Sequence, residues 1–97
     1  MNAQETIRLL SAKLPAIRAR FGVDELAIFG SVARNEALPT SDVDVLVDFT
    51  QRPTFDNYMG LKLYLEELFG TGVDLVIHSD LRPALLPRVE QEALIVS

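Results

Sequence analysis

Residues 26–47 read LAIFGSVARNEALPTSDVDVLV, and this stretch decides the fold. A short apolar run, residues 26–29, leads into Gly30 and Ser31, and after ten intervening residues Asp42 and Asp44 open a second apolar run. Short apolar runs that are bounded by turn residues are typical of strands. The stretch therefore predicts a strand, a Gly-Ser turn that opens a short helix, and a second strand that carries two carboxylates.

The two carboxylates lie two positions apart. Side chains at positions i and i+2 of a strand point to the same face, so Asp42 and Asp44 are expected to share a divalent cation. A Gly-Ser turn that opens a helix offers backbone N–H groups and a hydroxyl to a phosphate, here from Gly30 and Ser31. A phosphate site beside metal-binding carboxylates is suited to the transfer of a nucleotidyl group from a nucleoside triphosphate.

A site with two metal ions usually needs a third carboxylate, and magnesium prefers oxygen ligands. Asp74, near the start of the apolar segment 72–76 (GVDLV), is the best candidate. Each feature alone has an ordinary explanation, because Gly and Ser are common turn formers and a strand-end Asp is often solvated. Their order along the chain, each beside an apolar run, favours a site in which Asp42, Asp44 and Asp74 are catalytic and bind two magnesium ions.

Two further residues are candidates for nucleotide binding. Arg34 lies three residues after Ser31, so it is expected either to point toward the same phosphate or to form a surface pair with Glu36 or Asp42. Ser41 directly precedes Asp42 and either belongs to the nucleotide site or only caps the loop. Three other polar residues are interpreted as structural: His78 at a strand end, Tyr58 in the core and Tyr64 on the surface.

The helical spacing of apolar residues between 7 and 21 predicts an N-terminal helix that ends at Gly22. Pro15 predicts a break near Leu14, since proline lacks the N–H of the helical hydrogen bond. The other predicted elements are strands 25–29, 43–49 and 73–77, helices 31–36 and 55–69 (capped by Thr54), and a last helical segment that begins at Ser79 or Asp80, restarts near Arg88 and runs to Leu94.

Together these elements predict an α/β (α+β) fold, in which a small mixed sheet of three to four strands is backed by helices on one face. The 97 residues are expected to form a single domain, 1–97.

The composition excludes several classes of protein. No stretch is apolar enough to cross a membrane or to act as a signal peptide, and the absence of cysteine excludes thiol catalysis and disulfides. A net charge of −5 argues against direct nucleic-acid binding, which depends on Lys and Arg at the phosphates. A nucleotide that is bound through a metal ion is compatible with this charge. We therefore expect a cytoplasmic protein.

Three segments, FGSVAR (29–34), SDVDVLV (41–47) and VDLV (73–76), resemble the minimal nucleotidyltransferases of the polymerase-beta-type superfamily. This resemblance implies the nucleotidyltransferase fold and a magnesium-dependent transfer of AMP from ATP. It also implies that the chain is the antitoxin of a two-gene system, that the acceptor is a hydroxyl (expected to be a tyrosine) of a HEPN-type ribonuclease toxin, and that the two proteins form a hetero-oligomer.

The resemblance also implies roles for individual residues. Gly30 and Ser31 would hold the triphosphate, Asp42 and Asp44 would bind both metal ions, and Asp74 would complete the metal site and help to deprotonate the acceptor hydroxyl. The sequence departs from the family at Asn35, where Gly is usual. Asn tolerates left-handed backbone geometry better than other non-glycine residues, so the turn is expected to persist.

Two other functions remain open at this stage. One is a non-enzymatic antitoxin that neutralises the toxin by covering its active site; the intact set of three aspartates argues against it. The other is a free-standing transferase that acts on a small hydroxylated molecule or an RNA end. The short chain and its acidic charge make this function the weaker candidate.

Overall fold

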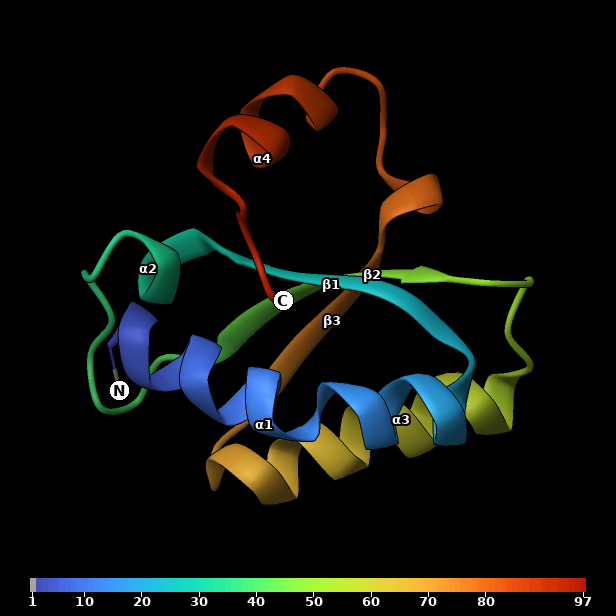
Figure 1. The fold of residues 1–97 in the computed structure, drawn as a ribbon. Coiled ribbons are helices and arrows are strands. Elements are labelled where there is room, and N and C mark those ends of the chain that lie inside the picture. The colour runs from blue at the N-terminus through green and yellow to red at the C-terminus, as the bar shows by residue number, and fades with distance from the viewer. Residues whose placement is uncertain (1) are drawn as a thin grey trace.

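The computed structural model describes residues 2–97, which form a four-stranded mixed sheet with two long helices on one face (Figure 1). The elements follow in the order α1 (Ala3–Phe21), β1 (Val23–Phe29), α2 (Gly30–Ala33), β2 (Val43–Phe49), α3 (Phe55–Phe69), β3 (Val73–Ile77), the 3-10 turn η1 (His78–Asp80), α4 (Leu86–Glu92) and β4 (Leu94–Ile95). The predicted α/β class with a small mixed sheet is confirmed.

The strands lie in the order β3-β2-β1-β4. β1 is antiparallel to both β2 and β4, whereas β2 and β3 are parallel. A parallel pair needs a crossover connection, and α3 supplies it. β2, α3 and β3 have the predicted bounds, Thr54 caps α3 by accepting the N–H of Asn57, and β1 begins two residues earlier than predicted.

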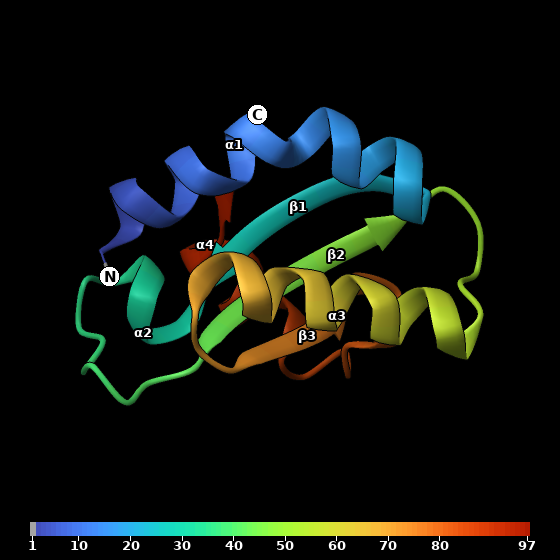
Figure 2. The ribbon, with the colours of Figure 1, turned by 90° about the horizontal axis from the view of Figure 1, so that it is seen from below.

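The core lies between the sheet and the helices α1 and α3, which run side by side over one face (Figure 2). Successive residues of β2 point to opposite faces, so its odd-numbered valines face these helices and its aspartates face the other way. The core combines these valines with apolar residues from β1 and both helices: Val43, Val45, Val47, Leu26, Ile28, Leu10, Leu14, Ile17, Leu61 and Leu65.

The predicted break near Pro15 is wrong, because α1 continues through it. Pro15 lies on the exposed side of the helix, where water can replace the missing hydrogen bond. The flanking residues Leu14 and Ile17 are both buried in the core and hold the two halves of the helix against the sheet. Packing of the apolar face thus outweighs the local effect of proline.

The short helix after Gly30 ends at Ala33 rather than at residue 36. Asn35 adopts the expected left-handed conformation, with φ 58°, and so terminates the turn. Its side-chain Oδ1 accepts the backbone N–H of Ala3 at 2.9 Å, which joins this turn to the start of α1.

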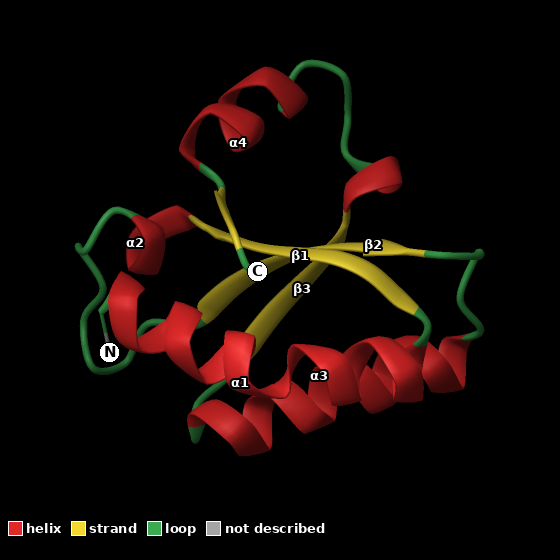
Figure 3. Ribbon diagram, in the orientation of Figure 1, coloured by secondary structure: helices red, strands yellow, loops and turns green. Residues whose placement is uncertain are grey.

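The segment after β3 differs most from the prediction. A 3-10 turn replaces the expected helical start at Ser79 or Asp80, and α4 begins at Leu86 because Pro87 is tolerated in a first helical turn. Leu94 is not helical but begins β4, which pairs with β1 (Figure 3). α4 lies on the side of the sheet opposite α1 and α3, so the prediction of helices on one face holds only for those two (Figure 1).

Tyr64 is also placed differently from the prediction. It is half-buried against the core and meets the ring of Phe21 edge-on, with 5.6 Å between the ring centroids. Tyr58 packs against the core as predicted, and its hydroxyl donates to the carbonyl of Leu75. Within residues 2–97, none of the helices combines the length and the apolar character that a bilayer crossing requires.

Candidate active site

Asp44 and Asp74 are direct register partners in the parallel pair of β2 and β3. Partner residues on neighbouring strands share a face of the sheet and lie about 5 Å apart. Asp42 lies two positions before Asp44, directly before the first residue of β2, and its Oδ1 lies beside Gly72. The topology thus brings Asp44 and Asp74 to the sheet face on which α4 lies, with Asp42 at the adjoining end of β2.

Two glycines make room for these carboxylates. Gly30 has φ 71°, and a Cβ atom at this position would overlap Oδ2 of Asp44. A Cβ atom on Gly72 would lie 2.5 Å from Oδ1 of Asp42, too close for a real contact. The sequence indicated Gly30 as part of a phosphate turn, but it indicated Gly72 only as the first residue of the apolar segment 72–76. The role of Gly72 as the backbone surface beside Asp42 depends on a contact between distant residues.

The carboxylates affect one another electrostatically. The pKa of Asp44 is raised above its ordinary value, chiefly because the half-buried group is desolvated and then because Asp74 and Asp42 repel its charge. Arg34 acts in the opposite direction. A bound cation would relieve this repulsion, and a donor set made only of carboxylate oxygens suits magnesium.

Within residues 2–97, however, no three acidic or histidine side chains converge closely enough to form a ready metal-binding group. The backbone positions and the donor chemistry of Asp42, Asp44 and Asp74 fit magnesium. Their assignment as metal ligands and catalytic residues therefore stays a prediction.

The Gly-Ser corner, formed by Gly30 and Ser31, connects β1 to α2. Its backbone carries a hydrogen bond from the Gly30 N–H to Oε1 of Glu92, with 3.0 Å between the two atoms. Arg34 donates from Nη1 to the other oxygen of Glu92 at 3.0 Å, and from Nε to Glu36 at 3.4 Å. These hydrogen bonds, first to Glu92 and then to Glu36, raise the pKa of Arg34.

Glu36 was one of the two surface partners predicted for Arg34, but Glu92 was missed. No local signal in the sequence could have indicated it, because Glu92 lies 58 residues from Arg34. Ser31 is the second residue of α2 and is half-buried directly beside Gly30.

Ser41 is used by its own loop. Its hydroxyl accepts the backbone N–H of Leu38 at 3.0 Å, and its N–H donates to the carbonyl of Leu38 at 2.9 Å. The side chain therefore closes the turn that precedes Asp42. This arrangement is the capping role that the sequence left open for Ser41.

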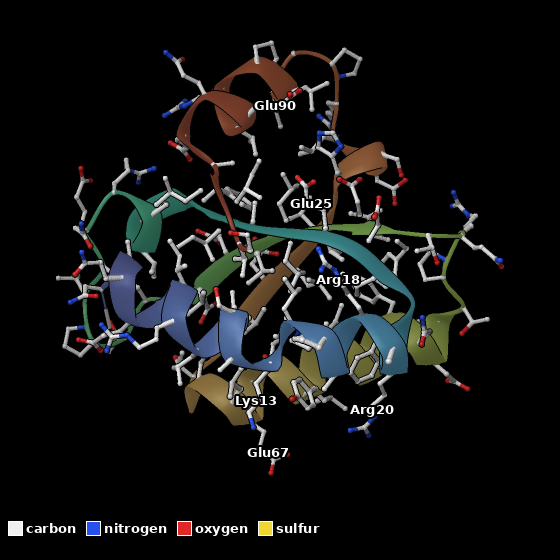
Figure 4. The ribbon with its side chains drawn as sticks, viewed as in Figure 1. Lys13, Arg18, Arg20, Glu25, Glu67 and Glu90 are labelled. Atoms are coloured by element: carbon white, nitrogen blue, oxygen red, sulfur yellow. The ribbon has the colours of Figure 1, made fainter. Side chains whose placement is uncertain are left out.

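His78 lies at the end of β3 that is remote from Asp74. Its Nδ1 is 3.3 Å from Asp48, and its Nε2 is 3.9 Å from Glu90 of α4. Glu90 lies on α4, on the side of the sheet opposite the two long helices (Figure 4). Through its contacts with Asp48 of β2 and Glu90, His78 joins α4 to the sheet at a distance from the corner.

The family model of the nucleotidyltransferase domain matches residues 10–96. The chain is 41% identical over 96 residues to the protein adenylyltransferase MntA of Thermococcus cleftensis. The aligned residues cover 99% of this chain and 97% of that protein. A solved structure described as a candidate minimal nucleotidyltransferase superposes with a TM-score of 0.81 at 40% identity, over 97% of this chain and 95% of that one.

A more distant structural match is a chain from the complex of tri-AMPylated HEPN toxin with MNT antitoxin from Shewanella oneidensis. Its TM-score is 0.67 at 17% identity, over 94% of this chain and 71% of that chain, which shows a common fold. The match of the family model to most of the chain, together with the 41% identity, shows the family. The chain belongs to the nucleotidyltransferase domain family.

Proposed function

We propose that this chain is an antitoxin that transfers AMP from ATP to a hydroxyl, expected to be a tyrosine, of a HEPN-type ribonuclease toxin. The reaction depends on magnesium and takes place in a cytoplasmic hetero-oligomer of the two proteins. The observation that carries the proposal is the pairing of Asp44 with Asp74 beside Gly30. It occurs in a chain that is 41% identical to a protein adenylyltransferase over 99% of its length.

The reaction is an in-line displacement at the α-phosphorus of ATP. The acceptor oxygen forms a new P–O bond, the bond from the α-phosphorus to the bridging oxygen breaks, and pyrophosphate leaves with the electron pair. The proton of the acceptor hydroxyl passes to Asp74. The Gly30 N–H, the Ser31 hydroxyl and the Arg34 guanidinium bind phosphate oxygens and hold the triphosphate in line.

Asp42 and Asp44, with Asp74, would hold magnesium. When bound, magnesium neutralises charge on the triphosphate and makes the acceptor hydroxyl easier to deprotonate. The pKa of Asp44 is raised first by desolvation and then by Asp74 and Asp42, and the repulsion from these two neighbours supports this assignment because a bound cation would relieve it. Ser41 acts indirectly, since it closes the turn that sets the position of Asp42.

The direct test is to incubate the full chain with its cognate HEPN partner, ATP and magnesium, and then to measure the intact mass of the partner. The expected result is an increase by one or more AMP groups, located on tyrosine by fragmentation. Asp44→Asn should abolish the increase. Asp48→Asn is the matched control, because Asp48 lies on the same strand and face but contacts His78 instead of the site.

A parallel assay of RNA cleavage by the partner separates the two antitoxin functions. If the wild-type chain and Asp44→Asn both silence the partner and neither changes its mass, the chain neutralises by covering the toxin. If the wild-type chain silences the partner and increases its mass, and Asp44→Asn does neither, the proposed transfer is responsible.

A further inference from the structure

The C-terminal helix places an acidic side chain on the Gly-Ser corner. Glu92 is the last residue of α4, and its side chain is 24% exposed. One carboxylate oxygen accepts the Gly30 N–H and the other accepts Nη1 of Arg34, each at 3.0 Å. Both oxygens of Glu92 are therefore bound, one by Gly30 of the corner and the other by Arg34, which directly follows α2.

A phosphate would need the same two donors. Backbone N–H and guanidinium groups bind carboxylate and phosphate oxygens in the same way, because both ligands are anionic and present paired oxygens. The Gly30 N–H carries a single hydrogen and serves one strong acceptor at a time. Glu92 and a phosphate oxygen thus exclude one another at Gly30.

Removal of Glu92 from the corner disturbs little packing. All of α4 is described, and none of its residues is buried. The two residues of β4 are exposed and pair with β1. Beyond them, Val96 is 1% exposed and donates its N–H to the carbonyl of Leu26 at 2.9 Å, and the carbonyl of Ser97 accepts the Ser11 hydroxyl at 2.8 Å. These contacts fix the tail after α4 and do not involve Glu92. Segments with few buried contacts open at low free-energy cost.

We propose that Glu92 is an internal competitor for the nucleotide: its carboxylate occupies the phosphate position at Gly30 and Arg34 in the nucleotide-free chain, and the triphosphate displaces it. This inference rests on the proposed function, because it requires nucleotide phosphates to bind at the corner. The affinity for nucleotide is then reduced by the fraction of time for which the corner is free of Glu92.

The test is equilibrium binding of the non-hydrolysable analogue AMP-PNP, with magnesium, to the full chain by calorimetry. Glu92→Ala should tighten binding by about three- to tenfold, which corresponds to a corner that is free for roughly a third to a tenth of the time. Glu92→Gln should show a smaller gain, since a glutamine oxygen still accepts the Gly30 N–H. Thermal unfolding checks that both variants are folded.

The matched control is Glu36→Gln. Glu36 is the other carboxylate on Arg34, at 3.4 Å, but it has no hydrogen bond to Gly30. Its replacement removes the same charge from the same arginine, so it should leave the affinity nearly unchanged. An equal gain in Glu36→Gln would mean that general charge repulsion is responsible, and it would overturn the role of Glu92.

The remaining outcomes separate this inference from the proposed function. If the wild-type chain binds AMP-PNP and the Glu92 variants bind it equally or more weakly, the competition is refuted and the transferase function stands. If neither the wild-type chain nor any variant binds, both are refuted. Binding by the Glu92 variants alone would be the extreme case of the expected result.

Discussion

Asp44 of β2 and Asp74 of β3 are paired in register on neighbouring parallel strands, on the sheet face opposite α1 and α3. The pKa of Asp44 is raised chiefly by desolvation and then by repulsion from the neighbouring carboxylates, Asp74 first. The arrangement is unfavourable for the isolated chain and favourable for a chain that binds cations. The stability of the protein should therefore respond to changes at Asp44 and to magnesium.

Asp44→Asn should raise the thermal midpoint of the metal-free protein near neutral pH. A raised pKa means that the folded state holds the proton of Asp44 more tightly than the unfolded state does. The ionised carboxylate therefore lowers stability as the pH rises from the unfolded-state pKa to the folded-state pKa, and the loss is complete above the folded-state pKa. Thermal unfolding in a chelating buffer measures the change. Added magnesium should raise the midpoint of the wild type but not of the variant; a lower midpoint for Asp44→Asn without metal would contradict this account.

Gly30→Ala should destabilise the protein more than Gly70→Ala. Both glycines have left-handed φ values, 71° and 69°, so each substitution carries a backbone cost of about 1–2 kcal/mol. A Cβ on Gly70 meets nothing within 4 Å, whereas one on Gly30 overlaps Asp44. Urea unfolding gives the difference. Most of the extra loss should disappear when Gly30→Ala is combined with Asp44→Ala, which removes the overlapping Oδ2 and Cγ atoms but keeps Cβ. Equal losses in the two single variants would show that the contact is unimportant.

Glu66→Gln should lower stability near pH 7. Glu66 accepts the N–H of Val73 at 3.1 Å and pairs with Lys62 at 3.4 Å. The first contact is the main reason why the pKa of its carboxyl lies below the ordinary value of a glutamate. A lowered pKa stabilises the fold above the unfolded-state value, and this stabilisation is lost as the pH falls through the folded-state value. Urea unfolding across this range should show the variant approaching the wild type in acid.

Glu67→Gln is the control for this measurement. Glu67 neighbours Glu66 on α3 but is exposed, with its side chain directed away from the sheet (Figure 4). Its replacement should change stability by less than about 0.5 kcal/mol at any pH. A similar pH dependence in both variants would assign the effect to the overall charge of the helix.

Val96→Ala should cost about 1–3 kcal/mol of unfolding free energy, because it removes buried methyl groups and leaves a cavity under the C-terminal tail. Val96 is 1% exposed, whereas Ile95 is 62% exposed. Ile95→Ala should therefore be nearly neutral when the two variants are compared by urea unfolding. If the two losses were reversed, the pairing of β4 with β1 would be in a different register from the one described.

The elements around the site could be predicted because their signals are local. The apolar runs before Gly30 and after Asp44 define two strands, and the spacing of residues 55–69 defines α3 with its cap at Thr54. Pro15 shows the limit of such signals: it predicts a break when taken alone, but the buried residues on either side keep α1 intact.

The sequence by itself determined the strands and the Gly-Ser turn that carry or adjoin the candidate site residues, since strand alternation and turn preferences act over a few residues. Only the tertiary structure decided that Asp74 stands beside Asp44, that Gly72 lies under Asp42 and that Glu92 reaches Gly30. The formation of β4 is of the same kind, because a two-residue strand exists only where the edge of β1 accepts it. These contacts join distant parts of the chain, and their free energy comes from packing and register rather than from local preference.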